Sequence, residues 1–476
     1  MPHEGERGGV TGSLRRLLDS PEAHAMRAEM HIETPTATGA PPPTLRVPRP
    51  DPEALPHLVI AIDGSEGHIP LEGGFPGAEA AVVTIAAVFI DLRKLRDVED
   101  RGIPDPRRFK DLHGTEGIEL LLPSTNLVLG DDPDARSSFR RKVYEVLGSR
   151  RVFDDGETLL ETYETLLSLR EGRSDKLPGC PLMDLCPHEE ARYHSHAAIG
   201  ACQCGEHPTY STDALRIYEA FTDVATNQTA VTETRSAIEH LVLVNIMRYF
   251  ERHALWSSMR TVAVVMDGPL AVSGHPAWLA ISIKSELARL AELCQERTGT
   301  VPTVFGIEKT GMFQDHLLRL AHPVPEAGTP GEMPDPRTVR RTSLINPGEV
   351  LLVNDAYVKK NIIFKHEVGP GPFKPYGSTS HYGRKALYHT TGGALITLMP
   401  AFLRPGDDAT LSEARVEQFP NLPVILSLLD ALVSDRYPNA TIPLVVAHAE
   451  AAIPAHANAG VLRRFLRGEE PAGVER

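Results

Sequence analysis

Two hydrophobic segments of this chain end in the dipeptide Asp-Gly. Residues 57–62 lead into Asp63-Gly64, and residues 262–266 lead into Asp267-Gly268. Each segment is typical of a buried strand that carries a carboxylate to its C-terminal end, where the glycine turns the chain. Because Asp-Gly is also a favoured turn dipeptide, one copy has a purely structural explanation. Two copies on distant strands favour a divalent-metal site on a mixed sheet.

Two such carboxylates suit the hydrolysis of a phosphodiester by two metal ions held roughly 3.5–4 Å apart. A third acidic ligand is expected from a helix beside the sheet, and Glu233 and Glu239 are the candidates. Their spacing does not decide between them. We prefer Glu239, because apolar residues surround it and a buried acid needs a metal ion or a basic partner. The alternative for Glu239 is a solvated position on an amphipathic helix.

A histidine completes this group of polar residues. His448 directly follows the apolar segment 443–447, which we interpret as a strand that leads into a helix. Histidine in such a position serves as a metal ligand, as a general acid or as an ordinary polar residue. As a further polar group at a strand end, His448 is a candidate member of the same site.

The elements that must position these residues alternate between strands and helices. This alternation predicts an α/β sheet covered by helices, in which the second strand forms a hairpin with the first. Strands are expected at 57–63, 80–91, 261–267, 301–309, 350–355 and 393–400, and helices at 212–221, 229–253, 276–294 and 414–437, with a helical period over 137–172.

The chain is expected to have one large domain with flanking segments. Residues 1–56 are interpreted as an N-terminal arm with a Pro-rich linker, 57–465 as the folded domain and 466–476 as a flexible tail. Residues 176–210 interrupt the helical rhythm with Pro, Gly, Cys and His, which is typical of an insertion.

Composition limits the function. The 476 residues carry a net charge of -14, which argues against a broad basic face for passive binding of nucleic acid. A local basic groove, or a partner that holds the polymer, remains compatible with this charge. No apolar run is long enough to span a membrane, and the first residues lack the pattern of a signal peptide. A cytoplasmic location is therefore expected.

Four of the five cysteines lie within the insertion, at Cys180, Cys186, Cys202 and Cys204. Four thiolates can hold a structural zinc ion tetrahedrally, and local density of cysteine in an intracellular chain favours metal binding. The spacings are irregular for a zinc knuckle, and nearby histidines can replace one thiolate. Free buried or redox-active thiols are the alternative.

Residues 354–388 form the most basic and aromatic part of the chain. Tyrosines interleaved with Lys and Arg suit a channel for single-stranded nucleic acid, in which the rings stack on bases. An ordinary β-hairpin with strand tyrosines explains the pattern equally well. Asp355 in this segment is either a further acid of the site or a turn residue at a strand end.

In their order and rough spacing, the site residues resemble the NurA nuclease domain family. The resemblance rests on Asp63-Gly64-Ser65, the helix with Glu239, Met266-Asp267-Gly268-Pro269-Leu270, Tyr437-Pro438 and Ala447-His448, and it extends from about residue 57 to 465. It implies a ribonuclease-H-like fold, Mn²⁺- or Mg²⁺-dependent nuclease activity on DNA, a homodimer and a hexameric HerA-type ATPase as partner. The metal-binding acids would be Asp63, Glu239 and Asp267, with His448 as a fourth group and Lys309 near the phosphate.

The chain departs from the compact family pattern in its N-terminal arm, its Cys-rich insertion and a long loop at 322–342. Its role would lie in DNA repair or in defence against phage. One alternative is a catalytically inactive ribonuclease-H-like scaffold that binds nucleic acid or the ATPase. Another is a metal phosphoesterase that acts on small nucleotides.

Overall fold

The structure is a computed structural model of the chain, which forms two compact units, Met1–Pro41 and Pro42–Arg476. In the first unit, helix α1 (Gly12–Leu18) precedes helix α2 (Pro21–Glu29), whose N-terminus is capped by Ser20. The structure describes residues 12–30, 44–51, 54–72, 77–93, 113–171, 200–201, 208–222, 225–322, 324–325, 341–363, 376–377, 379–401, 414–433, 442–452 and 462–468.

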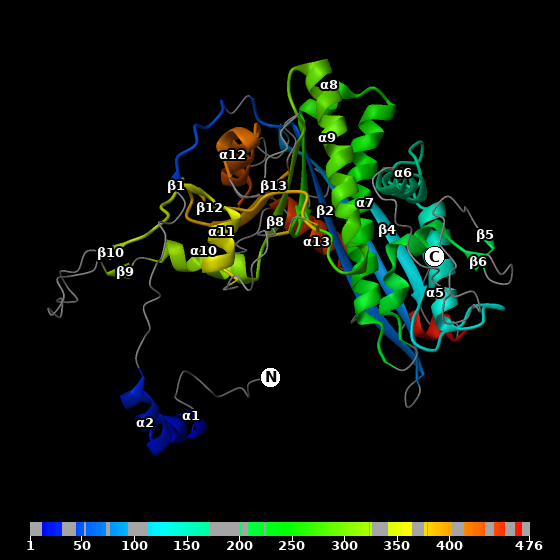
Figure 1. The fold of residues 1–476 in the computed structure, drawn as a ribbon, viewed down its shortest axis with the longest axis horizontal. Helices are drawn as coiled ribbons and strands as arrows, with labels where there is room; N and C mark the ends of the chain where they lie inside the picture. The colour runs from blue at the N-terminus through cyan, green and yellow to red at the C-terminus, as the bar shows by residue number, and fades with distance from the viewer. Residues whose placement is uncertain are drawn as a thin grey trace, which may run out of the picture. The chain divides into compact units, whose positions relative to one another are not determined.

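A large sheet forms the centre of the second unit (Figure 1). Its strand order is β1-β11-β12-β13-β8-β7-β2-β3-β4. The strands are β1 (Thr44–Leu45), β2 (Leu58–Glu72), β3 (Ala78–Asp91), β4 (His113–Pro123), β7 (Val262–Asp267), β8 (Thr303–Glu308), β11 (Val350–Leu352), β12 (Ala386–His389) and β13 (Leu395–Pro400). Two short pairs lie apart from it: β5 (Gly200–Ala201) with β6 (Pro208–Thr209), and β9 (Val324–Pro325) with β10 (Arg341–Thr342).

The register at the centre of the sheet places the two Asp-Gly segments beside each other. Strands β2, β7 and β8 are parallel, whereas the neighbouring pairs on both sides are antiparallel. The last pair between β2 and β7 joins Ile62 to Met266, so that Asp63 and Asp267 follow in register. Because adjacent strands lie about 4.8 Å apart, this register brings the two carboxylates to the same place.

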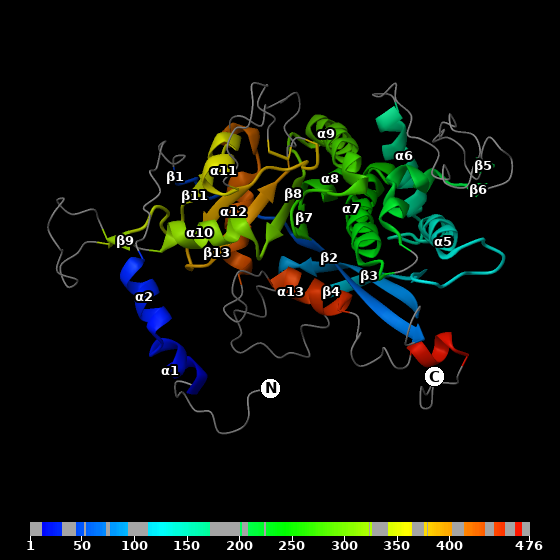
Figure 2. The same ribbon diagram turned by 60° about the horizontal axis from the view of Figure 1, so that its bottom comes forward.

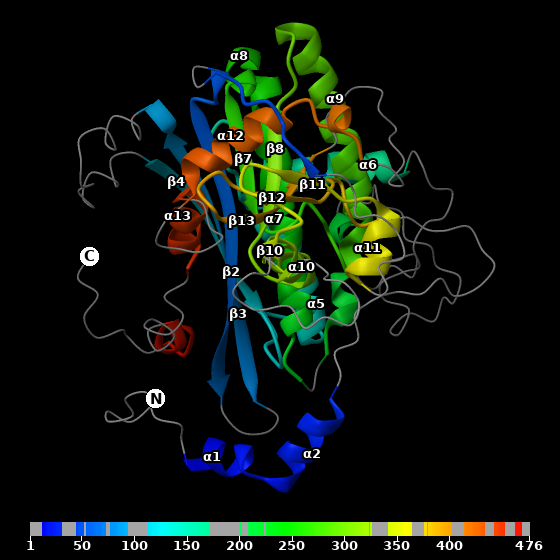
Figure 3. The ribbon, with the colours of Figure 1, turned by 90° about the vertical axis from the view of Figure 1, so that its left-hand side faces the viewer.

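Helices cover both faces of the sheet, as Figure 3 shows edge-on. Alternate residues of β2 serve the two cores: Ile60 and Ile62 face the first, and Val59 and Ala61 face the second. The first face is covered by α5 (Ala135–Ser149), α6 (Leu159–Glu171), α7 (Gln228–Arg252), α9 (Leu279–Thr298), α10 (Met312–Ala321) and α11 (Asp355–Asn361), and the second by α12 (Leu422–Leu432) and α13 (Ile442–Ala451). Helices α7 and α9 lie side by side (Figure 2), and α8 (Trp256–Arg260) follows α7.

The predicted α/β class, with a mixed sheet flanked by helices, is confirmed, and it is consistent with a ribonuclease-H-like fold. The hairpin of β2 with β3 and the strands at β7, β8 and β13 are present as expected. Strand β4 was not predicted. No helix among the described residues is long and apolar enough to cross a membrane.

Three local predictions were wrong. Asp63 does not end its strand, because β2 continues to Glu72 in its hairpin with β3. The segment before His448 is helical, because α13 packs its apolar residues across the second face of the sheet. The helix expected at 212–221 is two 3₁₀ helices, η2 (Ser211–Leu215) and η3 (Ile217–Ala220), which are separated by Arg216 in a left-handed conformation with φ of 61°.

Two other elements are shorter than expected. Helix α12 covers only the middle of the expected helix at 414–437, and it begins with Pro423 in its first turn, a position that proline tolerates. The strand expected at 350–355 ends at Leu352, and Asp355 begins α11.

Candidate metal centre

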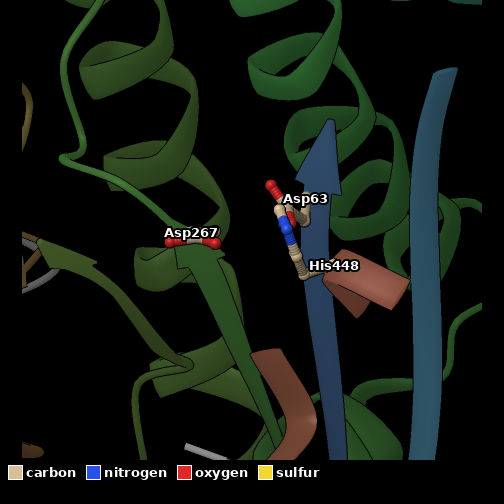
Figure 4. Close-up of side chains that lie close together, drawn as sticks. All are labelled: Asp63, Asp267 and His448. Atoms are coloured by element: carbon tan, nitrogen blue, oxygen red, sulfur yellow. The ribbon is translucent and has the colours of Figure 1, made fainter. Parts of the chain in front are cut away.

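Three of the predicted residues meet at one point of the sheet (Figure 4). Asp63 in β2, Asp267 at the end of β7 and His448 in α13 each offer a ligand atom, and these atoms lie within 4.8 Å of one another. The three residues differ in their exposure to solvent: Asp63 is buried, Asp267 is half-buried and His448 is exposed.

His448 reaches the site because α13 lies across β2. Its Nδ1 atom is 2.9 Å from Oδ2 of Asp63. The helix is held by fully buried Leu444 and Ala447. Ser65 adds a second tie, because its hydroxyl donates to the Ala451 carbonyl at 2.5 Å. These contacts fix α13, while 66% of the His448 side chain stays exposed.

Lys309 stands directly after β8, as predicted, and its Nζ atom donates to Oδ2 of Asp267 at 2.5 Å. Strand β8 pairs with β7 through Asp267 and Ile307, which brings the lysine beside the acid. The ammonium group therefore balances one of the two neighbouring carboxylates.

The second carboxylate is less well balanced. Burial raises the pKa of Asp63 above its usual value, and the nearby charge of Asp267 raises that pKa further. The hydrogen bond and charge of His448 and the charge of Lys309 act in the opposite direction. Two carboxylates and an imidazole that face one another form a donor set suited to Mn²⁺ or Mg²⁺. A cation there would also relieve the repulsion between Asp63 and Asp267, so the residues fit a divalent ion.

Glu239 approaches from the other face of the sheet, on α7. Its Oε1 atom lies so close to Gly64 that any side chain at position 64 would collide with it. The Glu239 side chain is only 5% exposed. Burial raises the pKa of Glu239 to about 7; Asp63 and Asp267 contribute to this rise, and Arg235 opposes it. The charges of both aspartates therefore act on the Glu239 carboxyl group, although Glu239 is not one of the three residues whose ligand atoms meet.

Glu233, the alternative acid of this helix, has another partner. Its carboxylate lies 2.9 Å from Nδ1 of His275, in the segment that follows β7. This contact ties α7 to the region after Asp267 and leaves Glu239 as the acid of α7 that lies against Gly64.

Among its described residues, the basic and aromatic segment 354–388 includes helix α11 and the first residues of strand β12. Tyr382 and Tyr388 are fully buried and cannot stack on bases. Arg384 lies 3.8 Å from Asp355, and Lys385 forms an ion pair with Glu308. Tyr388 is thus a strand residue of β12, as the hairpin interpretation expects, whereas Tyr382 precedes that strand. Burial raises the pKa of Asp355 to about 6, with Arg384 opposing this effect.

The zinc prediction concerns Cys180, Cys186, Cys202 and Cys204, which lie outside the described residues. The fifth cysteine, Cys294, is a buried free thiol in α9.

Two residues near the site were missed by the sequence analysis. Arg235 forms ion pairs with Glu239 and with Glu66 of β2. The spacing of Arg235 and Glu239 places them on one face of a helix, so this signal was available in the sequence.

A model of the NurA domain family matches residues 57–453, which confirms the resemblance found in the sequence. The chain is also similar to two solved structures. The NurA nuclease from Sulfolobus solfataricus is 10% identical, with a TM-score of 0.28, and the alignment covers 91% of this chain and 88% of that one. A second structure of NurA is 14% identical, with a TM-score of 0.22 and coverage of 96% and 97%. No curated protein matches the chain.

Proposed function

The chain belongs to the NurA domain family, and from this membership and its carboxylate cluster we propose that it is a divalent-metal-dependent nuclease that hydrolyses DNA. The observation that carries the proposal is the convergence of Asp63, Asp267 and His448 from three distant parts of the matched region. Carboxylates that face each other in this way are the ligands from which metal-dependent phosphodiester hydrolysis is built.

Asp63 and Asp267 would hold the ion, Mn²⁺ or Mg²⁺, with His448 as a further ligand and Glu239 as the acid from α7. A divalent ion supplies Lewis-acid activation of water and of the phosphate. The protein holds these donors on β2, β7, α7 and α13, elements whose apolar residues are buried in the two cores. Rigid support of this kind keeps the ligands in place before substrate arrives.

Lys309 would act on the substrate rather than on the ion. Its ammonium group lies beside Asp267 and its side chain is 28% exposed, so a phosphate that approaches the cluster meets a positive charge at its edge. Such a charge stabilises the negative charge that develops on the phosphate during hydrolysis.

The wider setting is proposed from the family resemblance. We infer that the chain acts as a homodimer with a HerA-type hexameric ATPase that delivers DNA, in repair or in defence against phage, within the cytoplasm. The net charge of -14 supports dependence on a partner, because an acidic surface binds free DNA weakly. The cysteine cluster would hold a structural zinc ion in the insertion.

The test is cleavage of linear DNA by the full chain with Mn²⁺, with an EDTA control. Asp63→Ala and Asp267→Ala should each lower the rate at least about a hundredfold, the upper end of what is lost when a residue that only orients a ligand is removed. Glu145→Gln, which changes an exposed acid of α5, should match the wild type. Equal cleavage by all four proteins would overturn the site.

The same assay separates the alternatives. Loss of activity in Glu239→Gln but not in Glu233→Gln would identify Glu239 as the acid of α7. Wild-type protein that cleaves dinucleotides but leaves long DNA intact would be a small-nucleotide phosphoesterase. Wild-type protein that cleaves nothing, even with its ATPase, would be a scaffold.

A further inference from the structure

We propose that Arg235 is a positioning residue that fixes the carboxylate of Glu239 for metal binding, and that Glu66 anchors Arg235. The inference rests on the proposed function and adds a metal-orienting pair outside the predicted site. The observation behind this inference is a pair of ion pairs that links α7 to β2, in which Arg235 contacts both Glu239 and Glu66.

Arg235 stands one helical turn before Glu239, so the two side chains share a face of α7. Its Nη1 atom donates to Oε1 of Glu239, and its Nε atom donates to Oε2 of Glu66 at 2.7 Å. The Gly64 carbonyl lies 3.5 Å from the same Nη1 atom. The guanidinium plane is thus held at several points, directly over the strand that carries Asp63.

Glu66 is itself fixed from α7. Gln228 donates to Oε1 of Glu66 at 2.7 Å, and the hydroxyl of Thr232 donates to the same oxygen at 2.5 Å. Gln228, Thr232, Arg235 and Glu239 follow one another at intervals of four, three and four residues, which form a single stripe along the helix. The stripe ties the helix to β2 next to the cluster.

This arrangement has a consequence for Glu239. A carboxylate on a side chain that is only 5% exposed needs a charged partner, and a rotating side chain would lose entropy on binding a metal ion. Arg235 supplies the charge and restricts the rotation, because a planar guanidinium with two carboxylate partners has little freedom. The carboxylate is then presented in one orientation before the ion arrives.

A direct contact of Arg235 with DNA phosphate is the competing role. Its side chain is 25% exposed, but its Nε and Nη1 donors already face carboxylates. These partners favour the positioning role.

The experiment measures Mn²⁺ binding to the full chain by titration calorimetry, a readout independent of cleavage. Arg235→Gln should weaken Mn²⁺ binding about 10- to 100-fold, the range found when a residue that orients a metal ligand is lost. Arg235→Lys should recover part of the affinity, since it keeps the charge but not the planar fork. Glu66→Gln should weaken binding less than Arg235→Gln does.

Arg252→Gln is the matched control. Arg252 lies on the same helix and pairs with Glu157 at 2.9 Å. It stands about 26 Å from Arg235 along the helix axis. The Arg252→Gln protein should bind Mn²⁺ with the affinity of the wild type. Melting curves in EDTA check that each variant is folded.

Several outcomes would overturn the inference. Unchanged Mn²⁺ affinity in Arg235→Gln with weaker DNA binding would make Arg235 a phosphate contact. Equal weakening in Arg252→Gln would make the effect a general one of helix stability. Either result leaves a wild type that binds Mn²⁺ and cleaves DNA, whereas a wild type that does neither contradicts the proposed function as well.

Discussion

At the scale of single residues, the two Asp-Gly dipeptides have different physical reasons for their glycines. Gly268 has a φ of 111°, a conformation that suits glycine and turns the chain after β7 as predicted. Gly64 lies inside β2, where it leaves room for the carboxylate of Glu239. The identical dipeptides predicted that the two aspartates share a site, and their carboxylates lie close together in the fold. They could not show that one glycine serves a turn and the other a close approach.

Glu239 should make the metal-free protein sensitive to pH. Its pKa is raised from 4.5 to about 7, so the folded state keeps a proton that the unfolded state has already lost. Stability is therefore fully present below pH 4.5 and declines as the pH rises through 7. Relative to the Glu239→Gln variant, the free energy of unfolding of the wild type should fall by up to about 3 kcal/mol as the pH rises from 4.5 through 7.

Denaturant unfolding of both proteins in EDTA at several pH values measures this difference. A gap between the two proteins that does not change from pH 4.5 to 8 would contradict the raised pKa. Asp132→Asn is a useful comparison, since the pKa of Asp132 is lowered by Arg141 and Ser138 despite some burial.

At the scale of elements, the local hydrophobic pattern correctly predicted the strands and helices that their own sequence favours. The hydrophobic segment of β7 and the long helix α7 agree with their predicted positions. Helix α13 does not, because Val445 and Val446 favour a strand locally. Packing of Leu444 and Ala447 against the sheet outweighs this preference. Tertiary contacts of that kind are not visible in a local pattern.

The position of α13 should control the function of His448. Leu444→Ala removes a fully buried side chain and is expected to destabilise the packing of α13 by about 2–5 kcal/mol. Hydrogen exchange over residues 442–452 should become faster, and DNA cleavage should fall with it. Val445→Ala, at a half-buried position of the same helix, should have a smaller effect. Protection of α13 that is unchanged in Leu444→Ala would contradict this account.

At the scale of the whole molecule, the candidate site depends on contacts between distant parts of the chain. Asp63 and His448 are 385 residues apart in sequence and hydrogen-bonded in the fold. The sequence indicated the residue types and the family, from which their convergence was expected. It could not supply the register of β2 with β7, the direction from which α13 arrives or the pairing of Glu239 with Arg235. These features depend on the packed sheet and its two cores.

The central claim is that Asp63, Asp267 and His448 together bind a divalent ion. A crystal of the full chain soaked in Mn²⁺, with anomalous scattering recorded for manganese, tests this claim most directly. We expect anomalous density among the three side chains, about 2.0–2.6 Å from carboxylate oxygens of Asp63 and Asp267, the range for hard divalent cations. A soaked crystal without manganese density there, in which Lys309 still contacts Asp267 and His448 still contacts Asp63, would contradict the claim.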